Sequence, residues 1–121
     1  MSSPSQLFSP ITLRELTLSN RIVVSPMCMY SATDRGALTD WHFVHLGSRA
    51  VGGAGLVMVE ATAVESRGRL SLGGSGLWED AQIEPLQCVI AFCHKYGAKL
   101  GVQLAHGGRR AGPGVKEPSS A

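Results

Sequence analysis

The strongest constraint on the fold is an uninterrupted apolar run, Leu56-Val57-Met58-Val59, which continues towards Ala61. Apolar runs without polar alternation are typical of strands buried on both faces, as in a parallel sheet. Shorter runs at 22–25 and 100–104 also suggest strands, and a segment with helical spacing separates each strand from the next. Strands that alternate with helices indicate βαβ units. The sequence therefore predicts an α/β protein with a parallel sheet.

Two helices are expected between these strands. Thr39 or Asp40 is expected to cap the first helix, which glycines at 52, 53 and 55 end and which carries the following residues at helical spacing: Trp41, Val44, His45, Ser48 and Val51. Asp80 is expected to cap the second helix, over roughly 81–96, whose inner stripe would be Ile83, Leu86, Val89, Ile90 and Cys93. Before the first strand, the short alternating segments 11–13 and 16–18 predict a β-hairpin.

The predicted elements do not complete a fold. Three parallel strands and two helices leave part of a sheet uncovered, whereas an eightfold barrel takes roughly 250 residues. Residues 1–6 are expected to form a disordered tail and residues 107–121 a loop, because neither segment carries a periodic signal. Residues 1–121 are therefore expected to be the N-terminal part of one larger domain.

Composition excludes several classes of function. A net charge of +2 is too small to indicate binding to nucleic acid or to an anionic membrane surface. The apolar stretches are too short to span a bilayer, and the N-terminus lacks the pattern of a secretory signal. Three cysteines fit no disulfide framework, so we expect a reducing, cytoplasmic location.

Chemistry-bearing residues follow the predicted strands, where parallel α/β folds place their sites. Cys28 and Tyr30 are two apart, so in strand register both would point the same way. Gln103 lies within an apolar strand, and a buried amide there would need partners such as the polar edge of a planar ligand. Glu60 also needs a partner, for which an arginine or a helix terminus would serve. Taken alone, Cys28 and Tyr30 are each more often packing residues.

Two other patterns do not predict sites. His42 and His45 share a helix face, but no third ligand is indicated nearby, so we expect packing or surface roles and no metal. The glycine clusters at 52–55 and 73–76 lack the context of a phosphate-binding loop.

Four stretches resemble the N-terminal third of the Old Yellow Enzyme family of flavin-dependent ene-reductases, in the family's order and spacing. They run from about Leu7 to Ala111 and read LFSPITLRELTLSNRIVVSPMCMYSA, DWHFVHLGSRAVGGAGLVMVEATAV, GRLSLGGSGLW and GVQLAHGGRRA. Cys28 and Tyr30, placed after Ser25-Pro26-Met27, resemble the thermophilic-like branch that includes the xenobiotic reductases.

The resemblance implies a fold and a set of roles. The fold would be a (β/α)8 TIM barrel that binds FMN in a single domain, of which this chain supplies the hairpin, about three parallel strands and two helices. The residues implied to contact FMN are Ser25, Pro26, Met27, Cys28, Ala61 and Gln103. Cys28 would tune the flavin and touch the substrate, and Tyr30 would hydrogen-bond the substrate's activating carbonyl.

The resemblance also implies a reaction and partners. Hydride would pass from NAD(P)H to FMN and then to an activated alkene, such as an α,β-unsaturated carbonyl or nitro compound. The anchoring histidines, the proton donor and the phosphate site would belong to a remaining barrel segment or second chain. We expect the complete protein to form a homo-oligomer and this chain alone neither to hold FMN nor to fold stably. A non-catalytic barrel fragment and a dienoyl-CoA reductase-like flavoprotein remain as alternatives.

Overall fold

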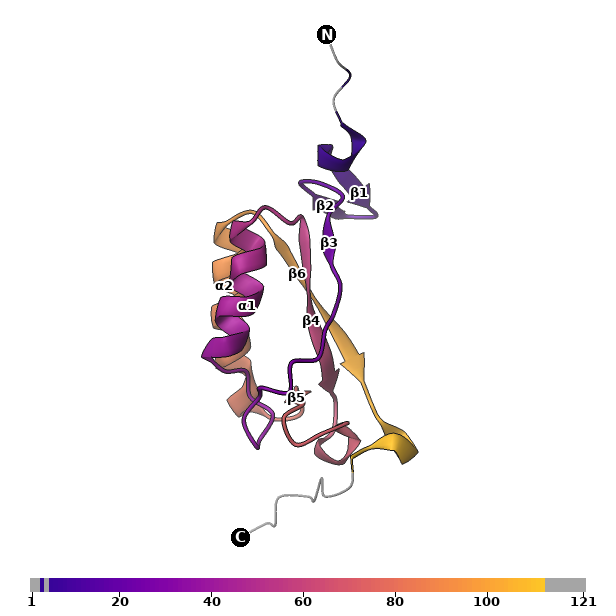
Figure 1. Ribbon diagram of the computed structural model, residues 1–121, viewed down its shortest axis with the longest axis vertical. Coiled ribbons are helices and arrows are strands. Elements are labelled where there is room, and N and C mark those ends of the chain that lie inside the picture. The colour runs from indigo at the N-terminus through magenta and orange to yellow at the C-terminus, as the bar shows by residue number, and fades with distance from the viewer. Residues whose placement is uncertain (1–2, 4, 113–121) are drawn as a thin grey trace.

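The structure, a computed structural model, describes residue 3 and residues 5–112 and confirms the α/β prediction (Figure 1). Its strands and helices, in chain order, are β1 (Ile11–Leu13), β2 (Leu16–Leu18), β3 (Val23–Val24), α1 (Asp40–Val51), β4 (Leu56–Ala63), β5 (Ser75–Gly76), α2 (Ile83–Lys95) and β6 (Lys99–Ala105). Single 3-10 turns lie at Gln6–Phe8, Ser66–Gly68, Asp80–Gln82 and Gly108–Arg110. The predicted hairpin forms from β1 and β2, which pair antiparallel.

β4 is the central strand of a parallel sheet. Val57 pairs with Val24 of β3 and with Leu100 of β6, so these two strands lie along opposite edges of β4. β5 pairs with the carboxyl end of β4, along the same edge as β3. β4 therefore has neighbouring strands on both of its edges.

Both helices lie on the same face of this sheet (Figure 1). The buried core between the helices and the sheet consists of Leu46, Ala50, Ala54, Val57, Val59, Val89, Cys93 and Ala98. Burial of an aliphatic side chain of this size stabilises a fold by about 1.5–3 kcal/mol. On the opposite face, Leu56 and Met58 are only partly buried, so within the described residues the helices cover one face of the sheet.

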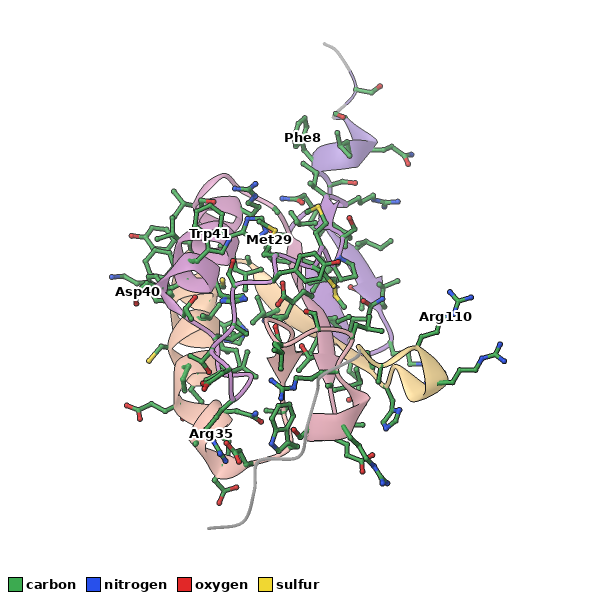
Figure 2. All side chains as sticks on the ribbon, turned by 60° about the horizontal axis from the view of Figure 1, so that its bottom comes forward. Phe8, Met29, Arg35, Asp40, Trp41 and Arg110 are labelled. Atoms are coloured by element: carbon green, nitrogen blue, oxygen red, sulfur yellow. The ribbon has the colours of Figure 1, made fainter. Side chains whose placement is uncertain are left out.

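The residues whose helical spacing marks α1 in the sequence do not form its buried face. Trp41, Val44 and Val51 are 51%, 62% and 57% exposed, and Figure 2 shows Trp41 on the outside of the helix. The buried face instead carries His42, Leu46, Gly47 and Ala50. An apolar pattern favours the wrong face here because a histidine and two small residues occupy the buried positions.

The stripe on α2 is largely confirmed, with Val89 and Cys93 fully buried, although Ile83 is 41% exposed. The cap predicted at Asp80 is wrong. A 3-10 turn, Asp80–Gln82, precedes α2. The Gln82 side chain caps the N-terminus of this turn, because its oxygen accepts the N–H groups of Trp78 and Glu79 at 2.6 and 3.1 Å. β5 was not predicted, because two residues inside a glycine-rich segment carry no periodic signal.

The ends of the chain were predicted to be irregular. Within the tail expected at 1–6, residues 1, 2 and 4 lie outside the described residues, and Gln6 begins a 3-10 turn. Of the loop expected at 107–121, residues 113–121 lie outside the described part, and Gly108–Arg110 form a 3-10 turn from which Arg110 projects (Figure 2). In the described residues, no helix has the length and apolar character needed to cross a membrane.

Candidate functional site

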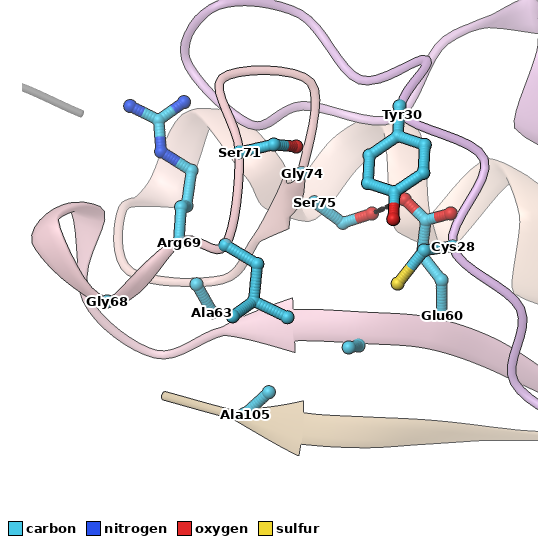
Figure 3. Close-up of a pocket in the computed structure, with 12 residues that line it drawn as sticks. Cys28, Tyr30, Glu60, Ala63, Gly68, Arg69, Ser71, Gly74, Ser75 and Ala105 are labelled. Atoms are coloured by element: carbon cyan, nitrogen blue, oxygen red, sulfur yellow. Dashed lines mark hydrogen bonds between the residues drawn. The ribbon is translucent and has the colours of Figure 1, made fainter. Parts of the chain in front are cut away.

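The segments that follow β3, β4 and β6 meet at the carboxyl ends of these parallel strands and line a pocket there (Figure 3). Its walls come from four places in the sequence: Cys28 and Tyr30 after β3, Glu60, Ala61 and Ala63 on β4, Ala105 on β6, and residues 68–71 and 74 before β5 together with Ser75 at the start of β5. The site therefore forms where parallel α/β folds are expected to place one.

Cys28 and Tyr30 both line this pocket, as predicted, but not because of strand register. β3 already ends at Val24, and Tyr30 adopts a left-handed backbone with φ of 54°. This conformation is uncommon for a residue with a bulky side chain and costs of order 1–3 kcal/mol. The two side chains are brought together by an irregular loop, in which Cys28 is exposed and Tyr30 is 67% exposed.

Hydrogen bonds on both sides of Tyr30 hold this loop. Ser31 Oγ donates to the Met29 carbonyl at 2.9 Å, and the Ala32 N–H donates to the Gly73 carbonyl at 3.0 Å. Gly73 packs so closely that a Cβ there would collide with the Tyr30 carbonyl. The loop is thus fixed by the segment before β5, which explains how the strained conformation of Tyr30 persists.

A β-bulge shapes the end of β4. Val59 pairs with Val102 and Thr62 with Leu104, so Glu60 and Ala61 together oppose the single residue Gln103. β-Bulges redirect side chains and are frequent beside active sites. Here Glu60 is buried and Ala61 partly exposed.

The expectation that Gln103 is buried is wrong. Gln103 belongs to β6, which among the described residues pairs only with β4 and so forms an edge of the sheet. The Gln103 side chain is exposed. Its amide can therefore present both donors and an acceptor to a ligand.

The carboxylate of Glu60, a residue 4% exposed, joins three segments. Its Oε2 accepts the Met29 N–H at 2.7 Å, and its Oε1 accepts both the Ser75 hydroxyl and His42 Nε2, the latter at 3.2 Å. The Thr39 N–H donates to Nδ1 of His42 at 3.0 Å, so the ring proton lies on Nε2 and points at Glu60. Burial acts to raise the pKa of Glu60, but the hydrogen bonds from His42, Ser75 and Met29 outweigh it and hold the pKa below its ordinary value.

The opposite wall of the pocket contains a polar group without a partner. The Ser71 hydroxyl is buried and, among the described residues, is the one buried side-chain polar atom that forms no hydrogen bond. Next to it in the sequence, the Leu72 carbonyl accepts from Nη1 of Arg69 at 3.3 Å; Arg69 is 3% exposed and also donates to the Asp34 carbonyl at 2.6 Å. An unsatisfied hydroxyl in a pocket wall suits a ligand that brings a polar group.

The structure brings together only some of the predicted site residues. Cys28, Tyr30 and Ala61 line one pocket. Ser25, Pro26 and Met27 lie between the end of β3 and Cys28 and do not line it. Gln103 is opposite the bulge but outside the pocket lining. His42 has both ring nitrogens engaged, which leaves neither for a metal, in agreement with the packing role expected for it.

Sequence reasoning did not anticipate the pocket wall between β4 and β5. Ser71 and Ser75 lie in a glycine-rich segment without periodic signal, and nothing in the pattern marks them. Glu60 was recognised only as a carboxyl in need of a partner; a carboxylate directly after four apolar residues was the available signal.

Comparison with known proteins agrees with this architecture. A model of the NADH:flavin oxidoreductase / NADH oxidase family matches residues 6–119. An NADPH dehydrogenase of Listeria welshimeri is 54% identical over 108 residues, which are 88% of this chain and 32% of that protein. An NADH:flavin oxidoreductase of Gibberella zeae is 50% identical over 110 residues, which are 91% of this chain and 26% of that protein.

Solved structures show the same fold. The Old Yellow Enzyme of a Pichia species superposes with a TM-score of 0.83 at 30% identity, over 89% of this chain and 28% of that one. A morphinone reductase variant in complex with tetrahydroNAD gives a TM-score of 0.81 at 30% identity, over 94% of this chain and 32% of that one. The described elements are therefore those of the N-terminal part of a TIM barrel.

The chain spans about a third or less of the length of these relatives. The family and its members imply FMN as the cofactor and NAD(P)H as the hydride donor. The residues present fit a flavin: Gln103 offers an exposed amide with mixed donors and acceptors, and Cys28 and Ala61 border the pocket without filling it. The sequence match and the fold together show that the chain belongs to the NADH:flavin oxidoreductase / NADH oxidase family.

Proposed function

We propose that this chain forms the N-terminal third of an FMN-dependent NAD(P)H oxidoreductase that reduces the activated C=C bonds of α,β-unsaturated carbonyl or nitro compounds. The observation that carries the proposal is the convergence of Cys28 and Tyr30 on one pocket at the carboxyl ends of the strands (Figure 3). A thiol and a phenol directed into a common pocket provide one group for the cofactor and one for the substrate.

The chain's own residues would bind FMN and polarise the carbonyl group of the substrate. Bound FMN would supply the redox chemistry, accepting hydride from NAD(P)H and passing it to the alkene. Ser25, Pro26, Met27, Cys28, Ala61 and Gln103 are the residues that would hold it. The exposed phenol of Tyr30 would donate a hydrogen bond to the carbonyl oxygen of the substrate. This bond favours reaction because it strengthens as negative charge develops on that oxygen.

Residues outside this chain would complete the barrel and its site. Since a barrel needs further strands, we propose that the remaining segment, in the same polypeptide or in a second chain, supplies the rest of the site, and that the completed protein is a homo-oligomer. A reducing, cytoplasmic location is supported by three cysteines that are all free, at positions 28, 88 and 93.

The test uses a completed barrel, in which this chain replaces the matching N-terminal third of the Listeria welshimeri NADPH dehydrogenase. The purified protein should be yellow, bleach with NADPH in the absence of oxygen, and recolour when cyclohexenone is added. A protein that NADPH bleaches but that only oxygen recolours would rule out the ene-reductase activity.

The chain expressed alone provides a second test. It should be colourless and should fail to unfold cooperatively, because β6 presents an open edge among the described residues and the rest of the barrel is missing. Circular dichroism and size-exclusion chromatography would check this. A compact, flavin-loaded monomer would contradict the proposed dependence on further strands.

A second candidate is a larger reductase with added domains. A 2-naphthoyl-CoA reductase superposes with a TM-score of 0.82 at 25% identity, but the match covers only 16% of that chain. Iron and acid-labile sulfide in the natural protein would favour a dienoyl-CoA reductase-like relative, and a preparation with FMN alone would favour the first candidate.

A further inference from the structure

The residue between Cys28 and Tyr30 is tied to the sheet by a single side chain. Met29 donates its backbone N–H to Glu60 Oε2 at 2.7 Å. We propose that Glu60 is a positioning residue, whose carboxylate fixes Met29 and thereby directs Cys28 and Tyr30 into the flavin site. This inference rests on the proposed function. It extends that function to Glu60, a residue to which no contact with cofactor or substrate has been assigned.

The position of Glu60 suits this task. The bulge lies at the end of the central strand, which is held by β3 and β5 on one edge and by β6 on the other. His42 in the first turn of α1 and Ser75 of β5 fix Oε1, leaving Oε2 directed at the loop. Because the Glu60 carboxylate is fixed by the sheet and by α1, it holds Met29 in one place although the loop around Met29 has no regular secondary structure.

The strained backbone at Tyr30 makes an anchor necessary. A left-handed residue persists only where its surroundings over-determine it. On the carboxyl side of Tyr30, the Ala32 N–H is held by the Gly73 carbonyl. On the amino side, the bond from the Met29 N–H to Glu60 is the corresponding restraint. Loss of that bond would let the loop relax towards an ordinary conformation, and Cys28 and Tyr30 would move with it.

An ionised carboxylate is required, since all three partners donate. Glutamine in place of Glu60 has one oxygen and one NH2 group. If its oxygen faces Met29, the NH2 group faces Nε2–H of His42, whose other nitrogen is committed to Thr39. If its oxygen faces His42, the NH2 group faces the Met29 N–H. The substitution keeps the size of the side chain but cannot satisfy the site.

The test compares Glu60→Gln with the parent in the completed barrel. We expect kcat/KM for cyclohexenone to fall about tenfold or more, with changes in both kcat and KM, as for the loss of a hydrogen bond to a charged group. A second readout does not need activity. In the apoprotein, with Cys88→Ser removing the other exposed thiol of residues 1–121, the rate of Cys28 alkylation by iodoacetamide should change about threefold or more.

A matched control is Gln82→Ala. Gln82 is 2% exposed, against 4% for Glu60, and it too joins separate segments: its side chain accepts the Trp78 and Glu79 N–H groups and donates to the Arg35 carbonyl. None of its hydrogen bonds involves residues 28–30. It should lower Tm without changing KM for cyclohexenone or the alkylation of Cys28.

If Glu60→Gln does not fold, His42→Gln replaces it. Glutamine at this helix position can still accept the N-cap N–H, as in a capping box, but removes the ring donor to Glu60. It should shift both readouts in the same direction by a smaller factor.

The outcomes are distinguishable. Unchanged KM and alkylation in either folded variant, with only Tm lowered as in Gln82→Ala, would reduce Glu60 to a structural residue and overturn the inference. If the parent barrel fails to reduce cyclohexenone, the proposed function fails instead, and the alkylation rate still decides whether Glu60 positions Cys28.

Discussion

The covered face of the sheet and the open end of its strands are built on different principles. Under the helices, Leu46, Val57 and Val89 pack with other apolar side chains, and no single contact decides the arrangement. At the strand ends, the loop that carries Cys28 and Tyr30 depends on a few polar contacts, centred on Glu60. Apolar packing tolerates replacement by similar shapes, whereas a polar network is sensitive to the loss of any member. The core should therefore govern stability alone, and the network both stability and function.

Removal of the Glu60 carboxylate should have the largest effect on stability. Glu60→Ala leaves the donors of Met29, His42 and Ser75 without an acceptor, and should lower the free energy of unfolding by about 3–5 kcal/mol. Denaturant unfolding of the completed barrel would measure it. A loss below about 1 kcal/mol would mean that water replaces the carboxylate and that the two regions do not differ as described.

Truncation in the core should affect stability without affecting the site. Leu46→Ala, at a side chain 3% exposed, should cost about 3 kcal/mol, and KM for cyclohexenone should not change. Val44→Ala, on the same helix but 62% exposed, is the matched control and should stay within about 0.5 kcal/mol. A rise in KM for Leu46→Ala would show that the core and the loop are coupled.

Acid should weaken the network before the core. The pKa of Glu60 lies below its ordinary value of 4.5 in the folded protein, so the unfolded chain binds the proton more readily. The stability from this carboxylate is therefore present above about pH 4.5 and is lost as the pH falls through the folded pKa. The difference in Tm between the parent and Glu60→Gln should be greatest near neutral pH and shrink below about pH 4.5. A difference that stays constant down to pH 3 would contradict this sign.

The smallest expected effect on stability belongs to the exposed phenol. Tyr30→Phe removes a hydroxyl from a side chain 67% exposed and should change the free energy of unfolding by less than about 0.5 kcal/mol. Because the hydroxyl is assigned to the substrate carbonyl, kcat/KM for cyclohexenone should fall about tenfold, as expected for one hydrogen bond. An unchanged kcat/KM would remove Tyr30 from the proposed mechanism.

The sequence was most informative where packing decides the structure. The hairpin, the long strand β4 and the inner residues Val89 and Cys93 of α2 were predictable, because apolar periodicity reports burial directly. The same rule failed on α1, since His42 is buried through its hydrogen bonds and not through apolar character.

The site was predictable in its location but not in its construction. Cys28 and Tyr30 were expected to share a direction, yet the cause is the left-handed backbone at Tyr30 and not strand alternation. Gln103 was expected to be buried because the pattern cannot show that β6 forms an edge of the described sheet. No sequence rule identifies the contacts to Ser75, which join residues far apart in the chain.

The β-bulge in β4 has a consequence for how this segment tolerates mutation. Glu60 and Ala61 together oppose Gln103, so β4 carries one residue more than its partner strand at this point. Deletion of Ala61 would leave Glu60 alone opposite Gln103, and Thr62 and Ala63 could keep their partners Leu104 and Ala105. The strand would then pair without a bulge, and Glu60 would lose the direction that the bulge gives its side chain. Loss of a single codon here should therefore leave the sheet paired but withdraw the carboxylate that holds Met29.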